Sequence, residues 1–145
     1  MIPGFNKDGN LPEGIYLAGE EEFLDRFTTD SSRRKWLGQR LKEIFTLAKL
    51  TENLKRIFVW GSFVSNKESP NDIDMLLLMA EDFQLENAPE ECRISFDYTM
   101  ARVRFHVDIF WSKASISEDT LSLWLDTYQT AKDFRRRGIV EVKLS

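Results

Sequence analysis

The sequence predicts a single-domain α/β (α+β) protein, with a small mixed β-sheet and helices packed on it. Segments with apolar residues at helical spacing alternate along the chain with short runs rich in β-branched and aromatic residues. The 145 residues are enough to bury one hydrophobic core but not two. No internal repeat or low-complexity tract divides the chain, so residues 1–145 are expected to fold as one unit.

The first third of the chain predicts two helices after an irregular start. Residues 1–19 are rich in glycine and include two prolines, so we expect an extended lead-in that crosses the surface. A short helix is expected over residues 20–27. Asp30 and Ser31 can cap a longer helix that runs to about residue 50. The apolar residues of this helix fall on one face and are expected in the core: Trp36, Leu37, Leu41, Ile44, Phe45 and Ala48.

Two strands are predicted in the middle of the chain. The run RIFVW at residues 56–60 is rich in β-branched and aromatic side chains and ends at Gly61. The run DIDMLLLM at residues 72–79 has an unbroken apolar end, which predicts burial on both faces of a sheet. A helix is expected over residues 91–103, because four apolar residues recur there at helical spacing: Cys92, Phe96, Met100 and Val103.

The last third of the chain predicts a strand, a helix and a strand. The run FHVDIFW at residues 105–111 alternates, so one face carries Phe105, Val107, Ile109 and Trp111 and the other carries His106, Asp108 and Phe110. Ser117 can cap a helix with the apolar residues Leu121, Trp124, Leu125 and Tyr128. The run IVEVKL at residues 139–144 is predicted to be the last strand, after a turn at Gly138.

Composition argues against several functional classes. The net charge of −4, from 20 basic and 24 acidic residues, argues against sequence-independent binding to duplex DNA. A single cysteine, Cys92, allows neither an internal disulfide nor a cysteine-cluster metal site. Without a long apolar run or a signal-like start, the chain is expected in the cytoplasm and not in a membrane. Two short basic clusters are expected to be solvated helix ends or turns: Arg33-Arg34-Lys35 and Arg135-Arg136-Arg137.

Three aspartates carry the strongest functional signal. Asp72 and Asp74 are two residues apart in a predicted strand, so their side chains share one face. Asp108 lies in a second predicted strand whose apolar residues occupy the opposite face. If the two strands are neighbours, three carboxylates meet, and a proton or a cation must relieve their repulsion. Oxygen ligands on rigid strands suit Mg²⁺, so the pattern predicts a magnesium site.

Gly61 and Ser62 predict a phosphate-binding turn beside that metal site. Glycine lets a ligand approach the backbone closely, and serine adds a hydroxyl next to free N–H groups. If Ser62 opens a short helical turn, its positive end can hold phosphate oxygens. Lys67, in the loop that follows, is a further candidate for phosphate contact, although loop lysines are more often simply solvated.

The order of these residues resembles the signature of the DNA polymerase β-like nucleotidyltransferase superfamily. A strand, Gly61-Ser62, nine residues, Asp72-x-Asp74 and a single Asp108 on a later strand follow one another within residues 57–111. The resemblance implies that the paired aspartates bind two Mg²⁺ ions, with Mn²⁺ as a substitute, and that Asp108 is a third ligand or a base. It also implies that the Gly-Ser turn binds the phosphates of an NTP, with ATP favoured. The expected reaction transfers an NMP to an acceptor and releases pyrophosphate.

The resemblance is closest to short, stand-alone bacterial members of that superfamily, some of which are antitoxins. Larger members select the acceptor with a helical domain, and the stretch after Trp111 is too short for one. A protein partner or a tRNA is therefore favoured as acceptor, with a small molecule still open. The alternative is a non-catalytic, antitoxin-like module that neutralises a toxin-like partner by contact. The presence of all three carboxylates favours the enzyme, and a sugar transferase is disfavoured because it needs a larger domain.

Simpler interpretations exist for single residues. Asn71 and Asp72 could cap an ordinary turn, but a turn does not require Asp74 or Asp108. His106 could carry a proton beside Asp108, although a polar residue on the open side of the sheet is the more frequent case. The four tryptophans are expected to pack in the core or at strand ends: Trp36, Trp60, Trp111 and Trp124.

Overall fold

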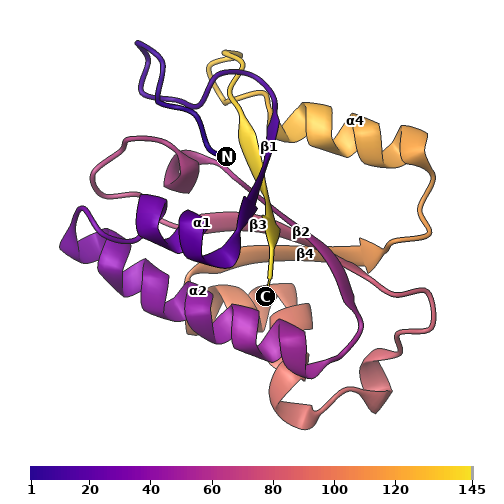
Figure 1. Cartoon of the computed structure of the whole chain (residues 1–145). Coiled ribbons are helices and arrows are strands. Elements are labelled where there is room, and N and C mark those ends of the chain that lie inside the picture. The colour runs from indigo at the N-terminus through magenta and orange to yellow at the C-terminus, as the bar shows by residue number, and fades with distance from the viewer. Residues whose placement is uncertain (145) are drawn as a thin grey trace.

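A computed structural model describes residues 1–144 as one mixed five-stranded sheet with helices on both faces (Figure 1). The strand order is β1-β5-β2-β3-β4. The predicted fold class is therefore confirmed. The strands are β1 (Ile15–Gly19), β2 (Leu54–Trp60), β3 (Ile73–Met79), β4 (Val107–Lys113) and β5 (Ile139–Lys143).

The pairing of the strands decides which residues meet. The outer pairs β1–β5 and β3–β4 are parallel, whereas β2 is antiparallel to both β3 and β5. A parallel pair needs a crossover, and the chain between β3 and β4 supplies one through helical segments. In this register Asp74 pairs with Asp108 of β4 on one side and with Trp60 of β2 on the other. The expected neighbourhood of the two aspartate-bearing strands is thus confirmed.

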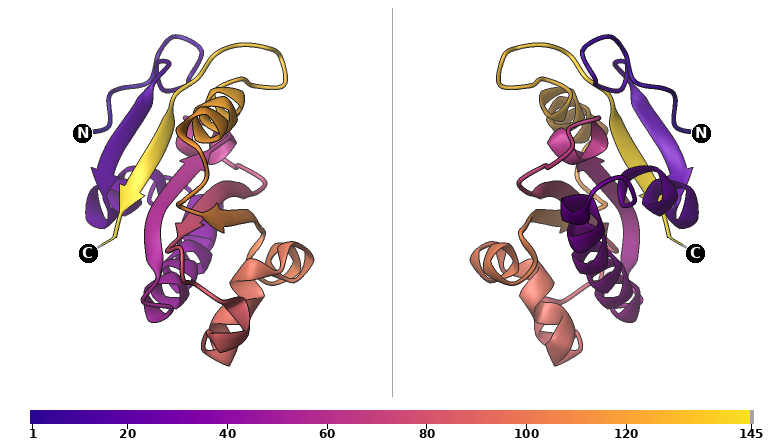
Figure 2. Two further views of the ribbon diagram at one scale, coloured as in Figure 1. Left: turned by 90° about the vertical axis from the view of Figure 1, so that its right-hand side faces the viewer. Right: turned by 90° about the vertical axis from the view of Figure 1, so that its left-hand side faces the viewer.

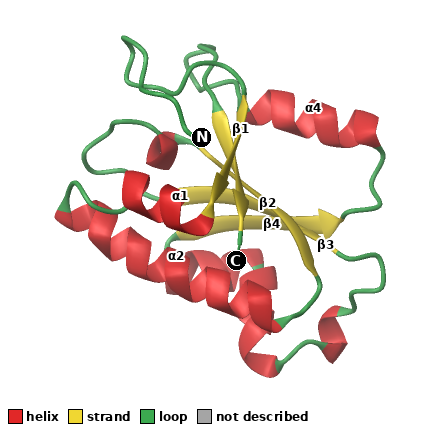
Figure 3. Cartoon of the chain, in the orientation of Figure 1, coloured by secondary structure: helices red, strands yellow, loops and turns green. Residues whose placement is uncertain are grey.

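Helices cover the two faces of the sheet unequally (Figure 3). A large apolar core lies between one face and the helices α1 and α2, and α4 covers part of the other face. None of the helices within residues 1–144 has the length and apolar character that crossing a bilayer requires. The α-helices are α1 (Glu20–Phe27), α2 (Ser32–Leu50), α3 (Tyr98–Phe105) and α4 (Glu118–Tyr128), and shorter 3₁₀ turns cover Ser62–Val64, Leu85–Asn87 and Glu90–Phe96.

Side chains along β3 point alternately to the two faces of the sheet, which places the candidate site on the face that α4 covers only in part. Ile73, Met75 and Leu77 point into the large core, whereas Leu76 and Leu78 pack in a second apolar cluster with α4. This explains the predicted burial of β3 on both faces. Even-numbered residues of β3 share a face, so Asp74 lies on the α4 side of the sheet.

Helix caps follow the sequence signals closely. The Ser31 side chain accepts a hydrogen bond from the backbone N–H of Arg34 at the start of α2, as predicted. Ser117 accepts one from Thr120 at the start of α4. These two helices therefore begin where the capping residues indicate.

The prediction that residues 1–19 are only a lead-in is wrong for the last five. Residues 15–19 form β1, which pairs in parallel with β5 at the edge of the sheet, as Figure 2 shows. Exposure alternates along this edge strand, with Ala18 buried and Ile15 and Leu17 exposed. Its sequence IYLAG has no polar residues on the exposed face, so it lacks the apolar–polar alternation that identifies a strand. Residues 1–14, which we call the N-terminal segment, contact the turns at one end of the sheet. Asn66 N–H donates to Gly9 O at 2.8 Å, and Gly138 N–H donates to Leu11 O at 2.8 Å.

The single helix expected over residues 91–103 is also wrong. A 3₁₀ segment over Glu90–Phe96 ends at Asp97, whose extended backbone starts α3 and whose carboxylate accepts from Met100 N–H at 3.0 Å. The N-cap at Asp97 therefore separates two helical segments that the apolar periodicity alone predicts as one helix. Cys92 and Phe96 are buried as expected, but the α3 residues Met100 and Val103 are 54% and 75% exposed.

The strand predicted at residues 105–111 begins two residues later. Phe105 is the buried last residue of α3, and His106 has a left-handed backbone (φ 59°) that ends the helix. His106 therefore does not share a strand face with Asp108, as had been expected. Its ring lies edge-on against the ring of Trp36, with 4.9 Å between the two ring centroids. Trp36 is 37% exposed, so it lies at the border of the α2 stripe and not in the core.

Candidate metal and phosphate site

Three carboxylates converge where the parallel strands β3 and β4 begin. Asp72 directly precedes β3, Asp74 lies in β3, and Asp108 lies opposite Asp74 in β4. Each offers a carboxylate oxygen, and these three atoms lie within 4.8 Å of one another. All three residues are partly buried. The structure thus brings together the three aspartates that the sequence pattern singled out.

The surroundings of Asp74 shift the pKa of its carboxyl group. Burial above all, together with the Asp72 charge and a hydrogen bond to Asp108, raises the pKa of Asp74 from its ordinary 3.8 to about 7. Arg137 acts in the opposite direction on the same pKa. Burial and the neighbouring negative charges therefore both disfavour ionised Asp74, and a bound cation would favour it.

Arg102 of α3 supplies part of the compensating charge. Its guanidinium forms an ion pair with Asp108 and lies 3.5 Å from an Asp72 oxygen. The Arg102 side chain is 51% exposed, so it can leave the carboxylates without breaking the core. The neighbouring Tyr98 also borders the cluster. Burial and a hydrogen bond to Asp108 raise the pKa of the Tyr98 hydroxyl.

Gly61 lies directly against the Asp74 carboxylate. Its φ of 90° and ψ of −165° fall in a region that residues other than glycine essentially do not occupy. A Cβ atom at this position would lie 2.5 Å from Asp74 Oδ2, which is well inside van der Waals contact. Both the backbone conformation and the close approach therefore require glycine here.

The loop that follows, residues 62–67, is held by a buried arginine. Ser62 opens a 3₁₀ turn, and Ser65 Oγ donates to Ser62 O at 2.6 Å. Arg34 of α2 is 3% exposed and donates to the backbone oxygens of Phe63 at 2.8 Å, Ser65 at 2.7 Å and Lys67 at 2.8 Å. We call residues 62–67 the serine loop, and Arg34 fixes its shape from beneath.

The expectation that the cluster Arg33-Arg34-Lys35 is merely solvated is therefore wrong for Arg34. Burial lowers the pKa of its guanidinium, and Asp30 partly compensates. One signal could have identified Arg34. It stands three residues before Leu37 and seven before Leu41, on the helical face that carries the apolar stripe. An arginine on a buried face needs several hydrogen-bond acceptors, and loop carbonyl groups supply them here.

A cavity of about 430 Å³ joins the serine loop to the carboxylates. The predicted residue Lys67 lies on its wall, and so do residues from the loop between α4 and β5, which sequence reasoning missed. The residues around the cavity are Gly61, Ser62, Lys67, Asn71, Asp72, Asp74, Ala131, Lys132, Asp133 and Arg137. Anionic and cationic side chains thus face one cavity from different elements.

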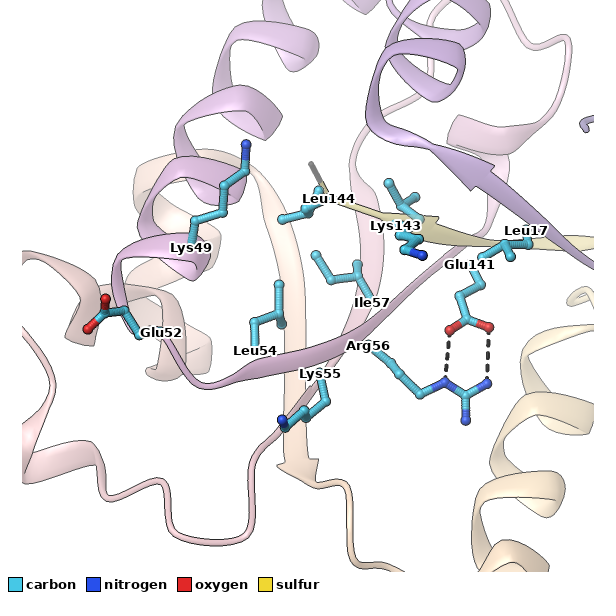
Figure 4. A pocket seen from close by; sticks show the side chains of 11 residues that line it. Leu17, Lys49, Glu52, Leu54, Lys55, Arg56, Ile57, Glu141, Lys143 and Leu144 are labelled. Carbon is cyan, nitrogen blue, oxygen red and sulfur yellow. Dashed lines mark hydrogen bonds and ion pairs between the residues drawn. The ribbon is translucent and has the colours of Figure 1, made fainter.

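A larger depression of about 640 Å³ lies at the other end of β2 (Figure 4). Three of its charged side chains form ion pairs. Arg56 binds Glu141 at 2.8 Å, and Lys49 binds Glu20 at 3.0 Å. No cluster of metal-ligand type was found there among residues 1–144. The cluster of three carboxylates borders the smaller cavity and not this depression.

The donor set at the aspartates fits a hard divalent cation. Asp72, Asp74 and Asp108 offer oxygen atoms without sulfur or nitrogen, which suits Mg²⁺ or Mn²⁺ better than zinc. Mg²⁺ usually binds one or two carboxylates together with substrate phosphates. The neighbouring cavity offers space and cationic side chains for such phosphates.

Comparison with known proteins identifies the family of the chain. Residues 3–143 match the model of a family of unknown function, DUF6932, so the chain belongs to this family. Searches of curated proteins and of solved structures gave no match. The chemistry of the site must therefore be inferred from its own residues.

Proposed function

We propose that this member of the DUF6932 family is a metal-dependent nucleotidyltransferase, which moves an NMP from an NTP to an acceptor and releases pyrophosphate. The observation that supports it most is the convergence of Asp72, Asp74 and Asp108 next to Gly61. A purely structural role would not place three carboxylates so close together, because their mutual repulsion costs free energy.

In this proposal the three aspartates hold two Mg²⁺ ions, for which Mn²⁺ can substitute. A bound metal would neutralise charge on the phosphate oxygens during transfer of the nucleotidyl group. Asp74 contributes to the binding only after it loses its proton, since its pKa is raised to about 7. Arg102 leaves the carboxylates when the cation takes over its role as counter-charge.

The serine loop binds the phosphates of the NTP in this proposal, with ATP favoured. Gly61 leaves the backbone open to a phosphate oxygen, because no side chain stands in the way. The Ser62 hydroxyl donates a hydrogen bond, and the Lys67 ammonium group supplies positive charge. Arg34 keeps the loop in shape and does not touch the nucleotide.

Asp108 acts on the side of the acceptor. An acceptor hydroxyl attacks the α-phosphorus, so that a new O–P bond forms while the bond to the bridging α,β-oxygen breaks. The hydroxyl proton passes to the Asp108 carboxylate, and pyrophosphate leaves. A protein partner or a tRNA end is the favoured acceptor, and the cytoplasm is the compartment in which the reaction would take place.

Label transfer from α-labelled NTPs tests this proposal. Purified wild type with Mg²⁺ is incubated with total tRNA and, separately, with the product of the adjacent gene. Label should appear on one acceptor with the wild type and with the control Asp82→Asn, whose exposed carboxylate lies outside the site. It should disappear with Asp108→Asn.

Nucleotide binding separates the enzyme from a contact-only module. Asp108→Asn should retain much of its nucleotide affinity, because Asp72 and Asp74 remain. If the wild type labels nothing, and Asp108→Asn still neutralises a toxic neighbour in cells, the protein acts by contact and the transferase proposal is wrong.

A further inference from the structure

We infer that Lys132 and Arg137 form a subsite for the distal phosphates of a polyphosphate, across the cavity from the serine loop. The inference rests on the proposed function and deepens it, because it assigns the cationic residues that would bind the β- and γ-phosphates of the NTP. Both residues belong to residues 131–137, between α4 and β5, which we call the arginine loop.

The cavity itself places the two loops opposite the same ligand volume. Ser62 and Lys67 come from the serine loop, whereas Lys132 and Arg137 come from the arginine loop. Asp72 and Asp74 line the same cavity as Arg137. A phosphate chain that starts at the aspartates can therefore reach Arg137.

Arg137 differs from its neighbours in the hydrogen bonds of its side chain. Arg135 forms ion pairs with Asp8 at 3.3 Å and with Asp133 at 3.6 Å. Arg136 pairs with Glu13 at 2.8 Å and with Asp126 at 2.7 Å. Within residues 1–144 the buried Nε of Arg137 has no hydrogen-bond partner. A buried donor of this kind is costly unless a ligand or water satisfies it.

The backbone of Arg137 is held in place on both sides. Its N–H donates to Gln129 O at 2.8 Å, and the following Gly138 N–H donates to Leu11 O at 2.8 Å. A Cβ atom at Gly138 would lie 2.3 Å from Pro12 O, so this attachment requires glycine. The guanidinium therefore starts from a fixed main chain, which lowers the entropy lost when it binds an anion.

The charges on the cavity wall match a polyphosphate. Lys67, Lys132 and Arg137 supply positive charge, whereas the Asp133 carboxylate on the same wall is compensated by Arg135. A guanidinium can bind two phosphate oxygens at once, and an ammonium group acts as a point charge. The pair would therefore hold the leaving pyrophosphate while the aspartates act at the α-phosphate.

Calorimetric binding of inorganic tripolyphosphate, of a non-hydrolysable NTP analogue and of the matching NMP tests the inference. Arg137→Gln should weaken both triphosphate ligands by about tenfold or more, the effect of losing a hydrogen bond to a charged group. Lys132→Gln should weaken them less, because its side chain is exposed. NMP affinity should not change, since an NMP lacks the distal phosphates.

Two variants control for structural effects. Arg136→Gln alters the same loop and changes the net charge by the same amount. Its partners Glu13 and Asp126 lie outside the cavity wall, so all three affinities should stay within about twofold, as expected for surface ion pairs. Arg137→Lys keeps the charge without the planar fork and should restore part of the tripolyphosphate affinity. Circular dichroism and thermal unfolding without ligand establish that each variant is folded.

The outcomes separate this inference from the proposed function. Unchanged triphosphate affinity in folded Arg137→Gln overturns the subsite and leaves the transferase intact. An equal loss of NMP affinity also overturns it, because the effect would then not concern the distal phosphates. Binding of tripolyphosphate that depends on Arg137, in a protein that transfers no label, supports the subsite and contradicts the transferase. A wild type that binds none of the three ligands overturns both.

Discussion

Gly61 and Asp74 cannot be treated as independent residues, because the glycine leaves room for the carboxylate. We predict that Gly61→Ala costs about 1–3 kcal/mol of folding free energy, from backbone strain and from the displaced Asp74. It should also abolish the increase in melting temperature that we expect Mg²⁺ and NTP to give to the wild type. Thermal unfolding with and without the ligands measures both effects.

A double variant tests whether the close approach is the cause. Asp74→Ala removes the atom that the new Cβ would meet, so Gly61→Ala should destabilise Asp74→Ala less than it destabilises the wild type. If the two changes in folding free energy were strictly additive, contact with the Asp74 carboxylate would not be what excludes a side chain at position 61.

The raised pKa of Asp74 predicts how the ligand-free protein responds to pH. Between its ordinary pKa of 3.8 and its folded value of about 7, the folded state binds the proton more tightly than the unfolded state. The contribution of Asp74 to stability is therefore present at low pH and is lost as pH rises through about 7. Denaturant unfolding without metal should show this decline, and Asp74→Asn should show a smaller one. Identical pH profiles for the two proteins would contradict the assignment.

Arg34 stabilises the serine loop through its carbonyl groups. Arg34→Met would leave several buried oxygens without a donor, so we expect a loss of about 2–4 kcal/mol in urea unfolding. Nucleotide affinity should fall as well, because the loop loses its shape. Lys35→Gln is the matched control, since Lys35 is adjacent and exposed. A variant as stable as that control would show that the loop folds without Arg34.

At the scale of elements, α3 supplies positive charge to the carboxylates through Arg102. We predict that Arg102→Gln binds Mg²⁺ more tightly than the wild type, because the guanidinium no longer competes for Asp108 and Asp72. Titration with Mn²⁺, followed by its paramagnetic signal, measures the affinity. Arg104→Gln in the same helix, where Arg104 pairs with Glu43, should have no such effect. Weaker metal binding by Arg102→Gln would mean that the arginine assists the cation.

The elements that could be predicted are those whose signals are local. Two serine caps and a 3.6-residue period predict α2 and α4, and continuous apolar runs predict β2 and β3. By contrast, β1 exists because β5 lies beside it, so its own five residues carry little signal. The break at Asp97 is a capping effect that a hydrophobic period does not record.

The residues of the candidate site likewise fall into those with a local sequence signal and those without one. Strand periodicity predicts that Asp72 and Asp74 share a face and that Asp108 lies opposite the apolar face of its own strand, and residue spacing marks the Gly61-Ser62 turn. The pairing of β3 with β4 then brings the three aspartates together. Arg34, Lys132 and Arg137 reach the site through tertiary packing, and a cluster of arginines in a sequence does not show which member turns inward. Their roles required the arrangement of α2 beneath one loop and of β5 beside another.

On the scale of the whole molecule, the N-terminal segment joins the two walls of the cavity. Its Gly9 carbonyl accepts from Asn66 at the end of the serine loop, and its Leu11 carbonyl accepts from Gly138 directly after the arginine loop. Leu11 itself is completely buried. Amide hydrogen exchange should therefore report one shared opening motion, in which the Asn66 and Gly138 amides lose protection together.

Leu11→Ala should accelerate exchange at both amides by the same factor, because it loosens the segment to which both are bonded. The Ala114 amide, which donates to Met79 O at the far end of β3, should not change. Acceleration at one of the two amides alone would contradict a shared motion. If the two respond together, the width of the cavity is controlled by a segment that contributes no side chain to its wall, and ligand release becomes a movement of the N-terminus.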